Sequence, residues 1–424
     1  MLSILTVLWL TAFGGVGDGK TLNTDVFSAA VDSLSRCGGG RLEVPAGIWL
    51  TGPIRFCDGM ELHLEKGAVV VFSTDRDLYP VIDINFEGTD NRRCISQLYA
   101  DGCRNISITG EGVFDGQGDA WRKVRRSKVS PTLWQKFLQW GGVVDAKGET
   151  WYPDQGYLDR ETRRGVCFDE TYIKSFLRPT LLTFTNCEQV LLEGCTFQNS
   201  PSWNLHPVFC KDVTVRGITV RNPEYSSNGD GIDIDACENV VVENSIFDCG
   251  DDAICVKSGK DADGRRHGRP AKNILISGCT VFHGHGGFVV GSEMSGGVQD
   301  VTVRGCRFLG TDVGLRFKSR RGRGGVVDGV VIEDIVMKDI AGNAIEFDLF
   351  YFDKSDRTLA RPVDETTPAF RNITIQNVKC AGCRRPVYIS GLPEMPVSGV
   401  QIRDCSFVSE QEMLIERAVN VEIR

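Results

Sequence analysis

A short pattern of alternating apolar and polar residues recurs through the C-terminal half of this 424-residue chain. Each copy has a run of alternating apolar residues, then a polar or glycine kink, then a second short apolar run. Alternation with a period of two indicates β-strands rather than amphipathic helices. The copies are VLLEGCTF (190–197), VTVRGITV (213–220), VVVENSIF (240–247), ILISGCTVF (274–282), VTVRGCRF (301–308), VVIEDIVM (330–337), ITIQNVKC (373–380) and VQIRDCSF (400–407).

Successive copies start between 23 and 43 residues apart, which is typical of short coils joined by loops of differing length. The pattern therefore predicts an all-β fold, a parallel β-helix whose coils stack about 4.8 Å apart. The 48 glycines fit a chain with many turns. Length alone suggests two or three domains, but a solenoid can extend further, and we expect residues 1–424 to form one domain.

Several of the 16 cysteines occupy an equivalent position in the repeat. Equal positions on successive coils lie above one another, so we expect an interior ladder of small apolar side chains. The chain is far too long for a disulfide-stapled mini-protein, and the lone CAGC at 380–383 is only a weak metal or redox signal. The residues at the shared position are Cys195, Cys279, Cys306 and Cys405.

The segment TLNTDVFSAAVDSLSRCGGG is predicted to form a helix that caps one end of the coil stack. Asn23 or Thr24 is the expected N-cap, and the glycines end the helix. The first nine residues, MLSILTVLW, lack basic residues and are too short to span a bilayer. They are either the remnant of a signal peptide or a first strand. The apolar face of the helix comprises Val26, Phe27, Ala30 and Leu34.

Residues 118–180 interrupt the repeat and combine four tryptophans with many charged residues. This composition is typical of a folded loop with its own small core, and aromatic side chains also form the walls of sugar sites. We therefore expect a loop-rich insertion near the substrate cleft. The tryptophans are Trp121, Trp134, Trp140 and Trp151.

The turns that follow the first strand of each coil carry a column of charged residues. Stacking places Asp230 one rung from Asp251 and Asp252, with carboxylates about 5–8 Å apart, and His285 one rung further. Arg316 and Lys318 are two residues apart in the next strand, so both point to one face. The turns are Gly229-Asp230-Gly231, Gly250-Asp251-Asp252, Gly284-His285-Gly286 and Asp312-Val313-Gly314.

Each of these residues also has a structural interpretation, because Asp is common in glycine turns and clustered Asp residues can bind calcium. However, no D-x-D-x-D-G loop is present. Close carboxyl groups suit glycoside hydrolysis, in which one donates a proton to the leaving oxygen and another activates water. Repulsion is expected to raise the pKa of the donor. The cations would hold a substrate carboxylate, which indicates a uronic acid polymer.

These motifs resemble those of glycoside hydrolase family 28, the polygalacturonases. Asn228-Gly229-Asp230-Gly231 is similar to the family's NTDG, and Gly250-Asp251-Asp252 to its G/QDD. Gly284-His285-Gly286 matches GHG, and Arg316-Phe317-Lys318 is similar to RIK. The four motifs occur in order, and the resemblance extends from about residue 14 to the C-terminus. The two differences, Gly229 and Phe317, fall between the chemically active residues.

The resemblance implies a right-handed, pectin lyase-like β-helix that hydrolyses α-1,4-galacturonosyl bonds with inversion and without a metal or cofactor. It implies that Asp251 is the general acid and that Asp230 and Asp252 position and activate the water. His285 would support protonation of the acid. The implied substrate-binding residues are Asn228, Arg316 and Lys318, together with Tyr351 by position alone.

Exo-acting bacterial members of the family are similar in having insertions that close one end of the cleft. The insertion at 118–180 and the loop at 258–272 are candidates, and the loop is expected to bring Arg265, Arg266 and Arg269 close to the site. We therefore expect an exo-acting, monomeric, secreted or periplasmic enzyme whose partner is a galacturonic-acid-containing polysaccharide or oligosaccharide. A net charge of −8 argues against nucleic acid, and no membrane partner is expected.

Three alternatives remain open. A calcium-dependent polysaccharide lyase and a rhamnogalacturonan-type hydrolase would have the same fold. A non-catalytic glycan-binding β-helix is the third, although binding alone does not require three crowded acids.

Overall fold

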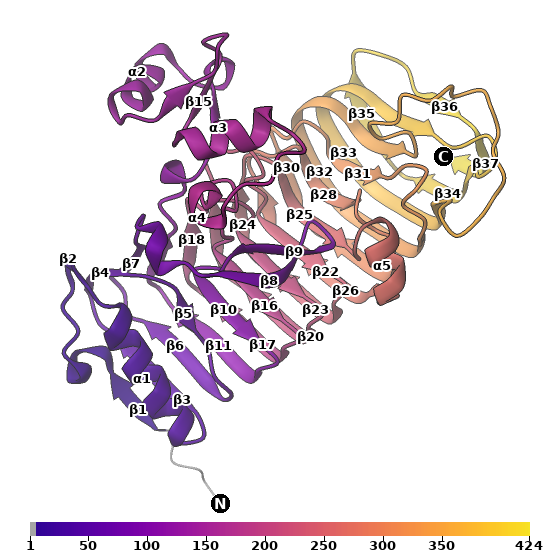
Figure 1. Ribbon diagram of the computed structural model, residues 1–424. Helices are drawn as coiled ribbons and strands as arrows, with labels where there is room; N and C mark the ends of the chain where they lie inside the picture. The colour runs from indigo at the N-terminus through magenta and orange to yellow at the C-terminus, as the bar shows by residue number, and fades with distance from the viewer. Residues whose placement is uncertain (1–5) are drawn as a thin grey trace, which may run out of the picture.

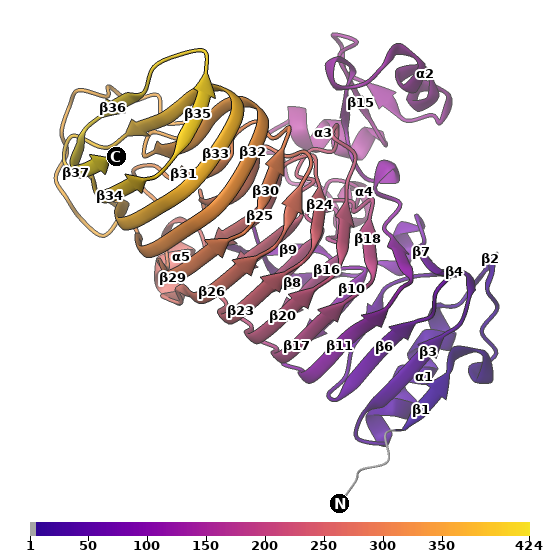
Figure 2. The ribbon, with the colours of Figure 1, turned by 180° about the vertical axis from the view of Figure 1, so that it is seen from behind.

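Residues 6–424 of the chain, as described by a computed structural model, form a long stack of coils (Figure 1). Each complete coil contributes strands to three parallel ladders, which backbone hydrogen bonds between successive coils join into one large sheet. Figure 2 shows the same stack from behind, with the strands of successive coils lying side by side. The predicted right-handed parallel β-helix is confirmed.

The first ladder contains the first strand of every repeat copy. The eight copies begin at residues that pair directly with one another, from Val190 and Val213 to Val400, so the register read from the sequence is confirmed. The strands are β1 (Val7–Trp9), β3 (Gly40–Val44), β6 (Met60–Leu64), β11 (Arg104–Gly110), β17 (Glu188–Glu193), β20 (Lys211–Arg216), β23 (Glu238–Glu243), β26 (Ala271–Ser277), β29 (Val298–Arg304), β32 (Val326–Asp348), β33 (Ala369–Ser390), β34 (Val397–Arg403) and β37 (Ala418–Ile423).

The second ladder contains the short strand after each kink, and the middle parts of β32 and β33 continue it. Its other strands are β2 (Asp18–Leu22), β4 (Gly47–Thr51), β7 (Ala68–Phe72), β12 (Val113–Asp115), β18 (Thr196–Gln198), β21 (Thr219–Arg221), β24 (Ile246–Asp248), β27 (Thr280–Val281), β30 (Arg307–Leu309) and β35 (Ser406–Ser409).

The third ladder follows the column of charged turns, and the ends of β32 and β33 continue it. Its other strands are β5 (Ile54–Arg55), β10 (Leu98–Asp101), β16 (Leu182–Thr185), β19 (Leu205–Val208), β22 (Ile232–Asp235), β25 (Asp252–Lys257), β28 (Gly286–Gly291), β31 (Leu315–Lys318) and β36 (Leu414–Glu416).

Apolar residues of all three ladders fill the interior of the coils. Phe317 stacks on Phe347 of the next coil, with ring centroids 4.5 Å apart. In the predicted cysteine ladder Cys195, Cys279 and Cys306 are buried, whereas Cys405 is only partly buried. All 16 cysteines are free thiols. A second buried column, which the repeat did not reveal, contains Cys103, Cys187, Cys210 and Cys237.

The CAGC cysteines belong to the same apolar interior. Cys380 and Cys383 are both buried, and burial raises the pKa of Cys380 to about 12. A thiol with so high a pKa is a poor nucleophile and a poor metal ligand. The structure therefore favours the small-apolar interpretation of this motif.

The N-terminal helix α1 (Thr24–Arg36) packs on the first coils, as predicted. Asn23 is its N-cap residue, but the Asn23 side chain bonds the backbone of Val16, Thr21 and Leu50 instead of the helix. Of the first nine residues, 1–5 lie outside the described part, and the rest include β1, a true strand. None of the helices in the described residues is long and apolar enough to cross a membrane.

The insertion at 118–180 forms a small body above the coils (Figure 1). Its own core contains Val124, Trp134, Phe137 and Trp151, as predicted for such a loop. Trp121 packs elsewhere, against Tyr79, and Trp140 is exposed. The insertion contains β13 (Val124–Arg125), α2 (Pro131–Gln139), β14 (Val143–Val144), β15 (Thr150–Tyr152), α3 (Gln155–Thr162) and α4 (Glu170–Ile173), together with the 3₁₀ turns η3 (Gly118–Ala120) and η4 (Arg126–Lys128). Two further 3₁₀ turns, η1 (Leu10–Phe13) and η2 (Arg76–Leu78), lie before the insertion.

A β-hairpin that the sequence analysis did not identify lies across the third ladder. It consists of β8 (Val81–Phe86) and β9 (Thr89–Cys94), and it extends toward β22 and β25 (Figure 1). Its tip contacts the short helix α5 (Asp261–His267), where the Lys260 amide donates to the Gly88 carbonyl at 2.7 Å. Asp90 also pairs with Arg266 at 2.6 Å and His267 at 3.0 Å. We call residues 81–94 the strap.

Candidate active site

The charged column lies on the outer face of the third ladder, as the stacking argument predicted. Asp252 pairs with Gly286 in the register of β25 and β28, which places Asp251 beside His285. Ile232 pairs with Ile254, so Asp230 precedes β22 at the level of Asp252. The apolar residues that alternate with this column point into the core and hold the strands in place.

The three aspartates are closer together than the rung spacing suggested. One oxygen each of Asp230, Asp251 and Asp252 lies within 4.8 Å of the other two. Asp230 and Asp252 are almost completely buried, and Asp251 is partly exposed. Three acids in so small a volume cannot all be ionised without compensation from cations or bound protons.

His285 compensates the charge of Asp251. The two side chains are 3.0 Å apart, Nδ1 to Oδ1. Burial acts to raise the pKa of Asp251, but the His285 hydrogen bond and charge and the nearby lysines outweigh it and lower that pKa to about 2. The same hydrogen bond raises the pKa of His285. Our expectation that repulsion raises the pKa of Asp251 is therefore wrong for this geometry, because His285 compensates the negative charge of the Asp251 carboxylate.

Asp230 is the carboxyl group with the raised pKa. Burial, and then the negative charges of Asp233 and Asp251, raise its pKa well above the usual range. Its Oδ1 atom is buried and has no hydrogen-bond partner among residues 6–424. In this geometry the repulsion within the cluster thus favours a proton on Asp230.

Two cations balance Asp252. Lys318 Nζ donates to Asp252 Oδ2 at 2.6 Å, and Arg316 Nη1 lies 3.8 Å from Asp252 Oδ1. Arg316 also bonds Glu346, Nε to Oε1, at 3.2 Å. The neighbouring residues of the strand point into the core, so the prediction that both cations share one face is confirmed. The Tyr351 ring lies 5.0 Å from Lys318 Nζ and 5.3 Å from Arg316 Cζ.

A cavity of about 410 Å³ opens over this cluster. Seven of the eight predicted site residues line it, and Arg316 packs directly beside it. The predicted lining residues are Asn228, Asp230, Asp251, Asp252, His285, Lys318 and Tyr351. The lining residues that the sequence analysis missed are Glu87, Trp203, Lys257, Lys260, Ser292, Glu293, Arg320, Arg323 and Phe352.

Lys257 is the most informative of the missed residues. It is the last residue of β25, and its ammonium group bonds Glu293 at 3.1 Å and lies 3.5 Å from Asp233 and 4.7 Å from the Trp203 ring. This buried cation balances the charges of Asp233 and Glu293 next to the three aspartates. The sequence feature that could have identified Lys257 is its position as a lysine at the end of the apolar run AICVK.

Asn228 has a fixed position at the edge of the cavity. Its Oδ1 accepts a hydrogen bond from Arg178 at 3.0 Å, and its backbone has a φ of 55°, which Asn tolerates better than most residues. The next residue is Gly229, where the related motif has Thr. A Cβ at that position would lie 1.9 Å from Ser226 Oγ, so the local packing requires glycine.

The arginines of the 258–272 loop do not line the cavity, which corrects our expectation. Arg265 donates to the carbonyls of Gly322 and Arg323, and Arg266 pairs with Asp90 and Asp263. Arg269 lies over the Phe209 ring. These side chains hold the loop and the strap in place, and only Lys260 of this loop reaches the cavity.

The 118–180 insertion contributes to an adjoining cavity of about 260 Å³ on the other side of Asp251 and His285. Lys123, Arg125 and Lys128 line it, together with Asn228 and Asp251. Asp251 thus lies between two cavities that each have cations in their walls, as the acid that cleaves a bond between two anionic sugars would.

The site has the composition of a glycosidase rather than of a calcium site. Calcium takes six to eight oxygen ligands, whereas Lys318, Arg316 and His285 occupy the space around these three acids. Carboxyl groups whose pKa values are shifted in opposite directions, beside cations that suit a substrate carboxylate, define a hydrolase for acidic carbohydrate.

Comparisons with known proteins agree with this class. Residues 133–422 match the sequence profile of "Glycosyl hydrolases family 28", and the chain belongs to this family of glycoside hydrolases. It is 31% identical to a probable polygalacturonase of Vitis vinifera over 409 residues, covering 93% of this chain and 72% of the relative. It is 28% identical to an exo-poly-alpha-D-galacturonosidase of Dickeya chrysanthemi, covering 88% and 62%.

A solved structure extends the similarity to the whole fold. The exopolygalacturonase of Thermotoga maritima, described as hyperthermoactive, superimposes with a TM-score of 0.83 and 32% identity. The superposition covers 98% of this chain and 92% of that protein.

Proposed function

We propose that this protein is an exo-acting hydrolase that releases galacturonate from the end of α-1,4-linked galacturonan. The observation that carries the proposal is the group of three carboxyls within 4.8 Å, two of them held by His285 and Lys318. The names of the Dickeya and Thermotoga relatives support the same substrate and the same exo mode.

In the proposed reaction, water attacks the anomeric carbon as the glycosidic carbon–oxygen bond breaks. Asp252, balanced by Lys318, accepts the proton of the water, and Asp230 helps to hold that water. The leaving oxygen receives a proton from Asp251, which His285 supplies through their hydrogen bond. The proton thus resides on His285 before reaction and passes through Asp251 as the bond breaks. Arg316 and Tyr351 orient the substrate carboxylate beside Lys318.

The strap supports exo action. Glu87 of the strap and Lys260 beside α5 both line the cavity, and Phe86 packs on Trp203 with ring centroids 4.7 Å apart. The Gly88 carbonyl and Asp90 fasten the tip of the strap to the α5 region. A strand pair fixed across the ladder in this way blocks one end of the cleft to a continuing polymer. This element, rather than the arginines of the 258–272 loop, is our proposed exo determinant.

Product analysis on oligogalacturonides of defined length tests the function. We expect galacturonate monomer from the first minute, with EDTA present and with no new near-ultraviolet absorbance. A ladder of products would contradict exo action. New absorbance, or a need for calcium, would favour the lyase, and no product from any pectic oligosaccharide would favour a binding protein.

The same time course read by proton NMR tests the stereochemistry. Inverting enzymes usually hold their two carboxyls about 6.5–9.5 Å apart, whereas oxygens of this cluster approach within 4.8 Å. We nevertheless predict inversion, because it is the stereochemistry that membership of glycoside hydrolase family 28 implies. The β-anomer should therefore accumulate first, and initial α-anomer would contradict the prediction.

The pH dependence of kcat/KM tests the proton path. The pKa of His285 is raised, so the proton is available below that pKa and is lost as pH rises through it. We therefore expect activity to extend above pH 6.5 and then to fall, and His285→Ala to move this alkaline limb. If the alkaline limb stays in His285→Ala but disappears in Asp230→Asn, Asp230 is the proton donor instead.

We further propose that the enzyme is a monomer and acts outside the cytoplasm, in the periplasm or after secretion, where pectic polymer is found. Light scattering coupled to gel filtration tests the first proposal, and cell fractionation tests the second. A stable dimer, or activity confined to the cytoplasm, would contradict them.

A further inference from the structure

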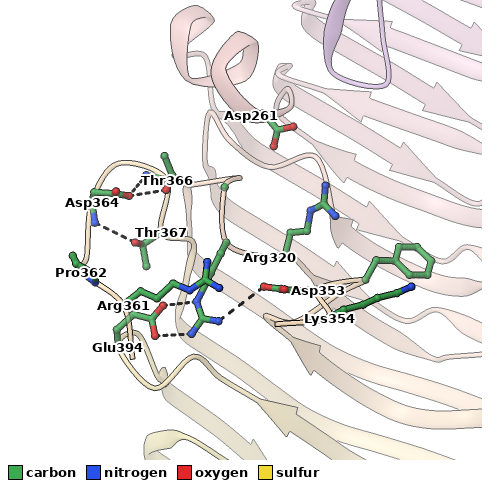
Figure 3. Close-up of a pocket in the computed structure, with 13 residues that line it drawn as sticks. Asp261, Arg320, Asp353, Lys354, Arg361, Pro362, Asp364, Thr366, Thr367 and Glu394 are labelled. Carbon is green, nitrogen blue, oxygen red and sulfur yellow. Dashed lines mark hydrogen bonds and ion pairs between the residues drawn. The ribbon is translucent and has the colours of Figure 1, made fainter. Parts of the chain in front are cut away.

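A second cavity, larger than the one over the aspartates, adjoins it. Its volume is about 790 Å³, and Arg320 and Phe352 line both cavities. The segments after β31 and β32 form most of its wall, so it follows Arg316 and Lys318 along the coil axis. We call it the distal cavity (Figure 3).

Most acidic side chains of the distal cavity already have partners. Arg321 bonds Glu394 at 2.6 Å and lies 4.0 Å from Asp353. Asp261 pairs with Arg323 at 2.5 Å. Asp364 accepts hydrogen bonds from the backbone and hydroxyl of Thr366, which closes its own turn.

Three cations of the same cavity have no such partner. Within residues 6–424, the side chains of Arg320, Lys354 and Arg361 make no ion pair and no hydrogen bond that meets the usual distance and angle criteria. Figure 3 shows Arg361 beside Glu394 on one side of the cavity, Lys354 beside Asp353 on the other, and Arg320 nearer to Asp261. Four acidic and four basic side chains line the cavity, so its charges balance overall, but these three cations, unbonded within the described residues, can each bind a carboxylate of an anionic ligand.

Phe352 adds a second feature of a sugar site. Its side chain is 77% exposed, although phenylalanine is usually buried, and it lies where the two cavities meet. Its backbone has a φ of 55°, a left-handed conformation that is rare for a bulky residue. Such strain is typical of functional positions. An exposed ring at the junction provides an apolar face on which a sugar ring can pack.

We propose that the distal cavity binds a further galacturonate unit of the substrate, with its carboxylate on Lys354 and Arg361 and its ring on Phe352. This inference rests on the proposed function. The unit lies beyond the one held by Arg316 and Lys318, so the cavity selects chains longer than a dimer. Because it recognises charge, it also selects free acid over methyl ester.

The kinetic test compares digalacturonate with tetragalacturonate. The wild type should have a kcat/KM about 10- to 100-fold higher for the tetramer, the range expected for contacts to charged groups. The double variant Lys354→Ala/Arg361→Ala should lose this preference and keep the wild-type rate on the dimer. Lys338→Ala/Arg307→Ala is the matched control on the second ladder, and it should keep the preference. With methyl-esterified substrates, the kcat/KM for the tetramer should not exceed that for the dimer in any of these proteins.

The inference would be overturned if the wild type and the Lys354→Ala/Arg361→Ala variant had the same ratio of kcat/KM for tetragalacturonate to kcat/KM for digalacturonate. The milder variant Lys354→Gln/Arg361→Gln, with melting curves for each protein, ensures that a folding defect is recognised. Calorimetric binding of tetragalacturonate separates this inference from the proposed function, because it needs no turnover. If no protein cleaves any substrate but the double variant alone binds tetramer more weakly, the proposed function fails and the distal subsite stands. If binding is also unchanged, the subsite fails.

Discussion

Replacing Asp251 with Asn is expected to lower kcat on oligogalacturonides by about 100- to 10,000-fold, the usual contribution of a general acid. Asn has the shape of Asp and can still bond His285, but it cannot relay a proton to the leaving oxygen. The fold should be unaffected, because the Asn side chain can keep the bond to His285 and the backbone carbonyl of residue 251 still accepts a hydrogen bond from the His285 amide. Reducing-sugar release, with circular dichroism as the folding check, measures both effects.

Asp248→Asn is the matched control for this prediction. Asp248 ends β24 three residues earlier, is partly exposed, and pairs with His283 at 2.8 Å outside the cavity. Its removal should leave kcat within about twofold, as is usual for surface ion pairs. Full activity of the Asp251→Asn protein would exclude Asp251 as the acid and would reopen the assignment of the whole cluster.

The fold could be predicted because the β-helix converts a sequence repeat directly into spatial register. Val190 and Val400 are far apart in the chain, yet both belong to one ladder at equivalent positions. The same rule places Asp251 beside His285 from the spacing of the turns alone. A repeat of this kind fixes the neighbours of each residue without any long-range contact having to be guessed.

The strap could not be predicted in the same way, because it does not belong to the repeat. Residues 81–94 alternate weakly and carry several charges, and their contacts with Lys260 and Arg266 bridge more than 170 residues. Such contacts depend on loop conformations that no periodicity specifies. The error over Arg265, Arg266 and Arg269 has the same cause, since a loop's place in sequence does not say which way its side chains point.

The sequence also could not predict which carboxyl group of the aspartate cluster has the raised pKa. Repulsion within the cluster was expected to raise the pKa of Asp251, but burial and repulsion raise the pKa of Asp230 instead, because the carboxyl that retains a proton depends on the partners of each. His285 and Lys318 compensate those two, and the buried Asp230 has no cation within hydrogen-bonding distance among the described residues. The raised pKa therefore belongs to Asp230, on the rung next to Asp251, for which the sequence analysis predicted it.

Replacing Lys318 with Met is expected to lower kcat/KM by about 100-fold or more and also to destabilise the protein. Met has a similar length, but it removes both the ion pair with Asp252 at 2.6 Å and the proposed contact to the substrate carboxylate. Breaking a buried ion pair from one side costs about 3–5 kcal/mol, because the remaining charge is left uncompensated. Lys338→Met, at an exposed lysine paired with Asp339, should change neither quantity.

The double variant Lys318→Met/Asp252→Asn separates the two effects. It removes both charges, so the free energy of unfolding should recover toward the wild-type value while activity stays lost, because the base is then absent as well. Chemical denaturation of the four proteins in this cycle measures the coupling. If Lys318→Met retains stability and activity, Lys318 neither holds Asp252 as a carboxylate nor binds substrate. If the double variant is as unstable as the single one, the cost comes from lost packing around Lys318 rather than from a stranded charge.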